Sequence, residues 1–443
     1  MTFTLDPIVS SPLPDLEFPD QIELGAGRNT QRWLNKHYYN YLTELKQNKQ
    51  NRPVAYMFVG GNLVELLRTM GFECVYPEIT ALATAIKHNS LDPILKAEEL
   101  GYGLDICGYV KTDIGLSVVG PGKTSFTDIP KPDLLVCNFS GCLVYIKWWE
   151  ALAEFYDCPL FLYDVPYLRD GIDIVHKEDL EYLKTQLGEL IEVCEKISGF
   201  SYDEKIMKQV LHYAKGAEQG WHDVLHMGKH KPSPLEAYFE AVNWMFPINV
   251  LRGLPQADMF YQIVKAELEL RMEQKFYPLP EEKFRIVVEG VPPYPSYRSF
   301  WDLFKNWGAV SVAATYPKVG GLFDLGESTF HDPNNPIESI ARYSLYAYCN
   351  LSFPLRNQIV ENYMNDYEAD ALVIHGIKSC RSFTAGQGDM RDFIINEAGY
   401  PALYIESDHQ DPRYYAEAQI KNRVDAFFEA LEHRKLTQTA TIR

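Results

Sequence analysis

The chain has 443 residues, and its 42 Lys and Arg against 60 Asp and Glu give a formal net charge of -18. Hydrophobic residues make up 46% and charged residues 23%, ordinary globular values that exclude disorder as the main state. The acidic excess argues against nucleic acid and anionic membranes as partners, because both are bound through faces rich in Lys and Arg. At roughly 100–200 residues per domain, the length predicts two to four domains.

The N-terminus lacks the basic segment and apolar run of a secretory signal. No stretch approaches about 18 uninterrupted apolar residues, so we expect no membrane-spanning helix. We therefore expect a cytoplasmic chain, in which thiols stay reduced. Under these conditions the eight cysteines are expected to be ligands, reactive thiols or packing residues rather than disulfides.

Taken in chain order, the pattern divides into four segments. Residues 1–50 read as a Pro-rich arm followed by a helix over 29–47. In residues 51–176, short apolar runs alternate with helices, and strands are predicted at 54–59, 72–76, 133–137 and 159–163, with a helix at 144–156.

The segment 177–283 reads as long amphipathic helices with few strand-like runs. In residues 284–443 the alternating pattern returns, with strands predicted at 284–289, 371–374 and 402–405 and a final helix at 415–431. The predicted fold class is therefore α/β, with two Rossmann-like parallel-sheet domains, a helical middle segment and an N-terminal arm.

Ligands of open α/β sheets bind beyond the carboxyl ends of the strands, and this rule selects three cysteines. Cys142 follows the strand at 133–137 and opens a helix, and Cys380 follows the strand at 371–374. Cys107 begins a helix after a glycine-rich turn. We interpret the other five as small buried packing residues: Cys74, Cys137, Cys158, Cys194, and Cys349 in a predicted helix around 343–348.

Three cysteines at helix starts can form a metal site, because helix N-termini favour the thiolate form that binds metal. Thiolates from three loops could hold three irons of a 4Fe-4S cluster and leave the fourth iron open. However, the wide spacing of Cys107, Cys142 and Cys380 matches no compact cysteine signature. On spacing alone, incidental loop cysteines remain the alternative.

A charged segment directly follows the strand predicted at 402–405. Asp408, Asp411 and Arg413 could bind substrate groups or relay protons at this strand end. Alternatively, Asp411 caps the final helix, with Pro412 at its first position. Both interpretations remain open for the three charged residues.

The C-terminal motifs Cys380-Arg-Ser-Phe-Thr-Ala-Gly-Gln-Gly-Asp-Met390, Gly399-Tyr-Pro-Ala-Leu-Tyr-Ile405 and Asp408-x-x-Asp-Pro-Arg413 resemble the 2-hydroxyacyl-CoA dehydratase and benzoyl-CoA reductase family. The segments Cys107-Gly-Tyr-Val110 and Asn138-Phe-Ser-Gly-Cys142 fit the other two cysteine sites of that family. The resemblance covers nearly the whole chain from about residue 30. Its three matching cysteines are those that the strand-end rule selects.

The resemblance implies that Cys107, Cys142 and Cys380 ligate one 4Fe-4S cluster, with one non-cysteine or open iron site, in a cleft between two α/β domains. The length and the arm look most like the larger cluster-binding subunit of an ATP-dependent benzoyl-CoA reductase. The implied partners are a homologous cluster-binding subunit, two ATP-hydrolysing activator subunits, ferredoxin as electron donor and an acyl-CoA substrate.

The activity that the resemblance implies is the passage of low-potential electrons to an aromatic acyl-CoA ring, which gives a cyclic dienoyl-CoA. Asp408, Asp411 and Arg413 are then expected to bind substrate, with Arg413 at the CoA phosphates. Many dehydratase relatives carry an acidic residue after the second cysteine, whereas this chain has Leu143, which disfavours a dehydratase. The alternatives are a radical 2-hydroxyacyl-CoA dehydratase subunit and a non-catalytic electron-relay subunit.

Overall fold

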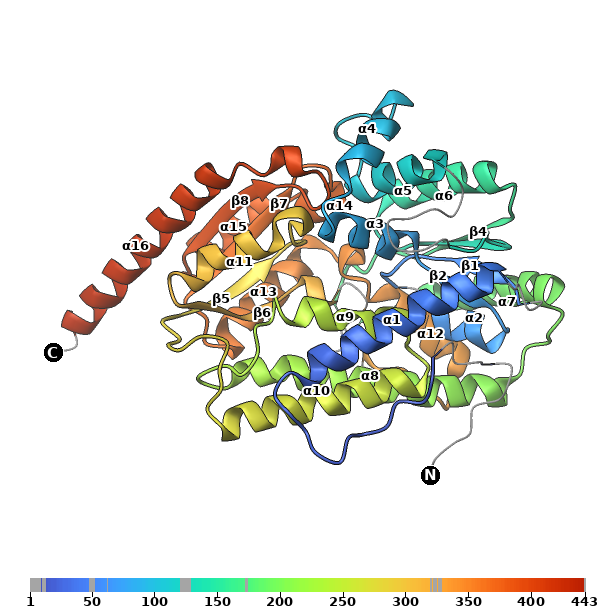
Figure 1. The fold of residues 1–443 in the computed structure, drawn as a ribbon, viewed down its shortest axis with the longest axis horizontal. Helices are drawn as coiled ribbons and strands as arrows, with labels where there is room; N and C mark the ends of the chain where they lie inside the picture. The colour runs from blue at the N-terminus through green and yellow to red at the C-terminus, as the bar shows by residue number, and fades with distance from the viewer. Residues whose placement is uncertain are drawn as a thin grey trace.

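Two four-stranded parallel sheets form the framework of the molecule (Figure 1). The computed structural model describes residues 9, 13–47, 52–61, 63–119, 129–171, 174–318, 321, 325 and 329–441. The first sheet has the order β2-β1-β3-β4, and the second has the order β6-β5-β7-β8. The strands are β1 (Val54–Tyr56), β2 (Glu73–Val75), β3 (Leu134–Phe139), β4 (Leu160–Asp164), β5 (Phe284–Glu289), β6 (Ala309–Ala314), β7 (Ala371–Ile377) and β8 (Ala402–Ser407). The predicted α/β class with two Rossmann-like sheets is confirmed.

The two sheets have the same strand order. In each, the chain runs through an inner strand (β1 or β5), moves to one edge (β2 or β6), and crosses back to the other side (β3 or β7). The order therefore reverses between β1 and β3 and between β5 and β7. Open parallel sheets bind ligands beyond the carboxyl ends of their strands at such a switch point. The fold thus provides two matching crevices.

Strands β5, β6 and β7 of the second sheet are buried on both faces, as parallel strands covered by helices are. Every residue of β5 and β7 is buried, which explains why their continuous apolar runs predicted strands. Strand β6 was missed, because its small residues and the polar Ser311 make a weaker apolar run. Ser311 is tolerated in the core because its hydroxyl donates a hydrogen bond to Glu236 Oε2, and its backbone N–H donates to Glu236 Oε1 at 2.6 Å.

Sixteen helices of the described residues surround the sheets. They are α1 (Ala26–Gln47), α2 (Val64–Thr69), α3 (Pro77–Ile86), α4 (Leu91–Glu99), α5 (Gly108–Val119), α6 (Leu143–Tyr156), α7 (Lys177–Ser198), α8 (Glu204–His226), α9 (Met245–Val250), α10 (Pro255–Glu273), α11 (Tyr297–Lys305), α12 (Pro336–Leu345), α13 (Phe353–Asp366), α14 (Arg381–Thr384), α15 (Gln387–Asn396) and α16 (Glu417–Thr441). None of these helices has the length and apolar character that crossing a membrane requires.

The helical middle lies alongside both sheets. Helices α8 and α10 run next to each other below the sheets in the view of Figure 1, and α1 crosses over them. The backbone N–H of Gly27 at the start of α1 donates to Glu267 Oε2 of α10 at 2.6 Å. Between residues 177 and 283 the described elements are helical, as the pattern predicted. The division into four segments at residues 50, 176 and 283 stays a prediction.

The last helix extends farther than expected. Helix α16 continues to Thr441, past the predicted end at residue 431, and its far end projects from the body of the molecule (Figure 1). Polar residues replace apolar ones after Glu432, but no Gly or Pro interrupts the helix there. The apolar pattern therefore ends where α16 stops packing against the core, whereas the helix itself continues.

A buried charge cluster joins the helical middle to the first sheet. Arg252, which follows α9 and is fully buried, pairs with Glu65 of α2 and donates to the hydroxyl of Tyr343 at 2.6 Å. Glu218 of α8 lies 3.9 Å from the same guanidinium and also pairs with His331. Burial alone would raise the pKa of Glu65, yet Arg252 and His331 outweigh it and lower that pKa. Glu65 therefore stays charged inside the protein.

We expect Arg252→Met to lower the free energy of unfolding by about 3–5 kcal/mol, because it leaves buried carboxylates without their cation. Urea unfolding followed by circular dichroism measures the change. Lys208→Met is the matched control, since Lys208 pairs with Glu204 on an exposed face of α8, and about 0.5 kcal/mol or less is expected there. An Arg252→Met protein as stable as the control would contradict this role of the charge cluster.

Candidate functional site

A buried cavity lies where the carboxyl ends of the two sheets meet. Gly60 after β1 and Ser140 and Cys142 after β3 line it from the first sheet. Val291 after β5 and Cys380 after β7 line it from the second. The switch points of both sheets therefore open onto one shared space, in the position that the topology favours for a ligand.

Cys142 and Cys380 occupy equivalent positions in the two sheets. Each is the residue before a helix that follows the third strand of its sheet, α6 for Cys142 and α14 for Cys380. Their backbones are nearly the same, with φ -122° and ψ 96° at Cys142 and φ -107° and ψ 103° at Cys380. The repeated topology therefore delivers one cysteine from each sheet.

Cys107 lines the same cavity from a third loop, directly before α5. Its carbonyl accepts the first hydrogen bond of that helix from Lys111 N at 3.1 Å. All three predicted cysteines are thus at helix starts, come from separate loops and line one cavity.

Burial controls the protonation of these thiols. It raises the pKa of Cys380 to about 12 and that of Cys107 well above the ordinary thiol value. Backbone N–H groups at the helix starts act in the opposite direction but are outweighed. The helix starts therefore favour the thiolate form, as expected, but by less than burial opposes it. Thiolates in this cavity require the positive charge of a bound metal group.

The sulfur donors fit a cluster better than a single ion. Within the described part of the chain, the only group whose ligand atoms all lie within 4.8 Å is Glu65, Glu218 and His331, and it contains no cysteine. Cysteines around an iron–sulfur cluster bind separate irons, so their sulfurs lie farther apart than ligands of one ion. Soft thiolate donors in an apolar cavity also suit such a cluster.

Cys349 is a fourth cysteine of the cavity lining, and sequence reasoning missed it. The helix expected around 343–348 is present only to Leu345, where α12 ends, and Tyr348–Asn350 forms one 3-10 turn. The turn around Gly141 approaches this segment so closely that a Cβ there would lie 2.1 Å from the carbonyl oxygen of Cys349. Cys349 follows no strand, so the strand-end rule had no means of selecting it.

Glu78 is a second residue that the sequence analysis overlooked. It lies in the first turn of α3, just after β2, and it lines the cysteine cavity. Burial raises the pKa of Glu78 to about 7, while hydrogen bonds from Val59 N, at 3.2 Å, and Tyr145 oppose the shift. The strand-end rule would have selected Glu78 had it been applied to carboxylates.

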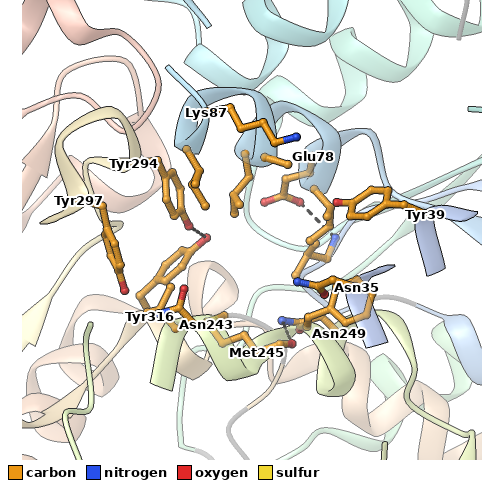
Figure 2. A pocket seen from close by; sticks show the side chains of 17 residues that line it. Asn35, Tyr39, Glu78, Lys87, Asn243, Met245, Asn249, Tyr294, Tyr297 and Tyr316 are labelled. Atoms are coloured by element: carbon orange, nitrogen blue, oxygen red, sulfur yellow. Dashed lines mark hydrogen bonds between the residues drawn. The ribbon is translucent and has the colours of Figure 1, made fainter. Parts of the chain in front are cut away.

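A second cavity of about 240 Å³ adjoins the first (Figure 2). Its lining is largely apolar and includes the aromatic side chains of Tyr39 of α1 and Tyr297 of α11. Glu78 and Tyr316 line both cavities, and the Tyr294 hydroxyl donates to that of Tyr316 at 2.6 Å. Because an apolar cavity of about 150 Å³ accepts benzene, this space is large enough for one aromatic ring.

An internal ion pair holds the wall beside Cys380. Arg356 donates to Glu289 Oε1 at 2.6 Å, and its guanidinium lies 4.8 Å from the ring centre of Tyr348. It also donates to the carbonyl of Phe383 at 3.3 Å. Tyr348 and Phe383 line the cysteine cavity. The buried pair therefore fixes the aromatic side of the site.

Asp408 connects the loops around the site. Its Oδ2 accepts hydrogen bonds from Ser379 N at 3.0 Å and Ser379 Oγ at 2.5 Å, and its Oδ1 accepts from Gln410 N at 2.9 Å. Ser379 directly precedes Cys380. Asp408 is 1% exposed, so its contacts within the chain hold the Cys380 loop against the loop after β8.

Asp411 and Arg413 also make contacts within the chain. Asp411 caps the short turn Pro412–Tyr414 by accepting from Arg413 N at 3.0 Å, whereas the final helix starts only at Glu417. Arg413 pairs with Asp411 and with Glu98, each at 2.6 Å. In the described structure, neither cavity is lined by Asp408, Asp411 or Arg413. Their role in substrate binding stays a prediction.

Comparison with known proteins assigns the chain to a family. Residues 63–431 match the model of the family described as 2-hydroxyglutaryl-CoA dehydratase, D-component. The chain is 38% identical over 405 residues to one of the subunits of benzoyl-CoA reductase from Thauera aromatica, covering 90% of this chain and 92% of the relative.

Two dehydratase subunits are less similar. The chain is 27% identical over 372 residues to the (R)-phenyllactyl-CoA dehydratase alpha subunit of Clostridium sporogenes, covering 84% of this chain and 88% of the relative. It is 26% identical over 398 residues to the (R)-2-hydroxyisocaproyl-CoA dehydratase alpha subunit of Clostridioides difficile, covering 89% of this chain and 94% of the relative. The chain therefore belongs to the 2-hydroxyacyl-CoA dehydratase and benzoyl-CoA reductase family of enzyme subunits.

Proposed function

We propose that the chain is the iron–sulfur subunit of an ATP-dependent, ferredoxin-driven benzoyl-CoA reductase. The observation that carries the proposal is the pair of adjoining cavities, one lined by Cys107, Cys142 and Cys380 and the other largely apolar with aromatic side chains in its wall. The higher identity to a benzoyl-CoA reductase subunit than to the two dehydratase subunits supports the same choice.

In this proposal, Cys107, Cys142 and Cys380 hold one 4Fe-4S cluster, which supplies single electrons of low potential when bound. The fourth iron carries a non-cysteine ligand or stays open. The chain contributes three sulfurs from three separate loops and a cavity wall braced by Arg356 and Glu289. Such rigid support would keep the cysteine ligands in place while the charge of a bound cluster changes.

The aromatic cavity would hold the acyl ring of the substrate. Its volume of about 240 Å³ suits a ring with its thioester carbonyl. Tyr294, Tyr297 and Tyr316 line one side, with Phe246 and Ile79 elsewhere in the wall. A ring bound against these apolar side chains would displace water, and fewer waters limit the wasteful reduction of protons during electron transfer to the ring.

We further propose Glu78 as the proton donor to the ring. Conversion of a benzoyl ring to a cyclic diene consumes two electrons and two protons, and a donor near the ring must supply each proton. Glu78 lies in the wall shared by the two cavities, and because its pKa is about 7, about half of the Glu78 carboxyl groups carry a proton at neutral pH. A donor whose pKa lies near the working pH is the most effective.

The proposed partners are a homologous cluster-binding subunit, two ATP-hydrolysing activator subunits and ferredoxin. The relatives are themselves named as single subunits of their enzymes, which indicates enzymes of more than one kind of chain. Adding one electron to an aromatic ring is strongly unfavourable, so ATP hydrolysis in the activator is expected to drive it. Asp408, Asp411 and Arg413 remain proposed substrate contacts beyond the end of β8.

A 2-hydroxyacyl-CoA dehydratase is the second candidate, because two of the relatives carry that activity in their names. Against it, Leu143 follows the second cysteine, where many dehydratase relatives have an acidic residue, and its side chain is exposed. A non-catalytic electron-relay subunit is the third candidate. A relay would need no ring-sized cavity beside the cysteines.

We expect Cys142→Ala and Cys380→Ala each to lose most of the bound iron and the broad visible absorbance, because each removes one sulfur of a three-sulfur site. Iron content per chain after anaerobic purification measures the loss. Cys194→Ala is the control, since Cys194 is a buried cysteine that lies in α7 and does not line the cavity. Full iron retention in both cavity variants would exclude them as ligands.

The same measurement on Cys349→Ala tests the number of ligands. With three cysteine ligands, this variant keeps its iron although Cys349 lines the cavity. Iron loss comparable to that of Cys142→Ala would instead identify Cys349 as a fourth ligand and contradict the open site.

The reaction itself separates the candidates. We expect the anaerobically purified complex to convert benzoyl-CoA to a cyclic dienoyl-CoA, with ATP consumed in proportion to product, as measured by liquid chromatography with mass detection. A 2-hydroxyacyl-CoA substrate run in parallel is expected to stay unchanged. Formation of an enoyl-CoA from it, with benzoyl-CoA untouched, would establish the dehydratase.

We expect Glu78→Gln to lower the turnover of benzoyl-CoA by about 10²–10⁴-fold, because an amide has no acidic proton to give. The wild-type rate should fall as pH rises through about 7, where Glu78 loses its proton, and the residual rate of the variant should lack that decline. Glu236→Gln is the control, since burial raises its pKa to about 7 as well but it lines neither cavity. A variant with full iron and wild-type turnover would exclude Glu78.

A further inference from the structure

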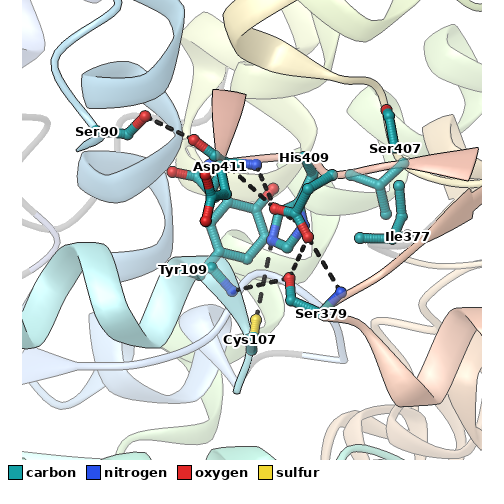
Figure 3. Close-up of polar contacts among 12 residues, drawn as sticks. Ser90, Cys107, Tyr109, Ile377, Ser379, Ser407, His409 and Asp411 are labelled. Carbon is teal, nitrogen blue, oxygen red and sulfur yellow. Dashed lines mark hydrogen bonds and ion pairs between the residues drawn. The ribbon is translucent and has the colours of Figure 1, made fainter. Parts of the chain in front are cut away.

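A buried histidine lies against one of the three cavity cysteines (Figure 3). The Nε2 atom of His409 is 3.8 Å from Cys107 Sγ, and the His409 side chain is 1% exposed. The imidazole also meets the ring of Tyr109 edge-on, with 4.4 Å between the ring centres. His409 lines the cysteine cavity from the loop after β8, so it reaches the site from the second sheet.

The residues around His409 determine which of its two ring nitrogens carries the proton. Its Nδ1 has no hydrogen-bond partner among the described residues, and the nearest carboxylate oxygen, Asp408 Oδ1, is 3.5 Å away. That oxygen already accepts hydrogen bonds from Gln410 N at 2.9 Å and Asp411 N at 3.0 Å. A ligating thiolate at Cys107 can only accept a hydrogen bond, so the proton belongs on Nε2.

The loops that carry the two groups are fixed against each other. The backbone N–H of Gly108 donates to Ser379 Oγ at 3.2 Å, and Ser379 Oγ donates to Asp408. A Cβ at Gly108 would lie 2.5 Å from the Cβ of Gln410, so the Cys107 loop and the loop carrying His409 are in close contact. His409 is therefore held in place beside Cys107 rather than swinging freely.

We propose that His409 donates an Nε2–H hydrogen bond to the Cys107 sulfur when that sulfur ligates the cluster, and thereby raises the reduction potential of the cluster. Reduction adds negative charge that is shared by the sulfurs, so a donor to sulfur stabilises the reduced form more than the oxidised form. The inference rests on the proposed function only in requiring the cluster. His409 acts through Cys107 and is a positioning residue.

The first test uses the unaltered chain, labelled with ¹⁵N-histidine and purified anaerobically with its cluster. Pulsed electron paramagnetic resonance of the reduced cluster should detect a weakly coupled histidine nitrogen. The same signal should be absent from His409→Phe, which keeps a ring of similar size without a donor. A wild-type spectrum with an intact cluster and no nitrogen coupling would overturn the proposal without relying on any variant.

The second test is a redox titration of the cluster, read by its electron paramagnetic resonance signal. The midpoint potential should be lower in His409→Phe than in the wild type, and His409→Gln, whose amide keeps an N–H donor, should recover part of the difference. Iron content is measured on each sample. A chain without iron refutes the proposed function, whereas full iron with equal potentials in the wild type and His409→Phe refutes only the role of His409.

Discussion

The site depends on one geometric constraint, the meeting of two parallel sheets at their carboxyl ends. Both sheets have the same strand order, so each has its switch point between its first and third strands. Each switch point sends one cysteine, Cys142 or Cys380, into the shared cavity as the residue before a helix. A single sheet would place only one such cysteine, so the ligand set exists because the two sheets face each other.

Burial raises the pKa of the acidic groups in that cavity. Thiols in it have a raised pKa, and the carboxyl group of Glu78 is shifted to about 7. The same apolar surroundings that oppose thiolates favour their neutralisation by a metal cluster, because charges attract more strongly where water is excluded. They also keep a substantial share of the Glu78 carboxyl groups protonated at neutral pH. The apolar surroundings therefore favour both the binding of a cluster by the cysteines and the protonation of the proposed proton donor.

Contacts away from the cavity hold its parts in position. Arg252 ties the helical middle to the first sheet through Glu65, and Arg356 ties the cavity wall to the second sheet through Glu289. Asp408 joins the loop of Cys380 to the loop that carries His409. These buried ionic and hydrogen-bonded groups show why polar residues in the core need partners: each carboxylate has its donors within the chain.

The sequence by itself determined the α/β class, seven of the eight strands and the three cysteines at strand and helix ends, because apolar periodicity and strand-end position are local properties. It did not reveal β6, because the hydroxyl of Ser311 finds its hydrogen-bond acceptor in the distant Glu236. Only the tertiary structure placed Cys349, Glu78 and His409 in one cavity, since their contacts join segments far apart in the chain. It also showed that burial outweighs the helix N-termini in setting the pKa of the thiols, a balance that depends on what surrounds each sulfur.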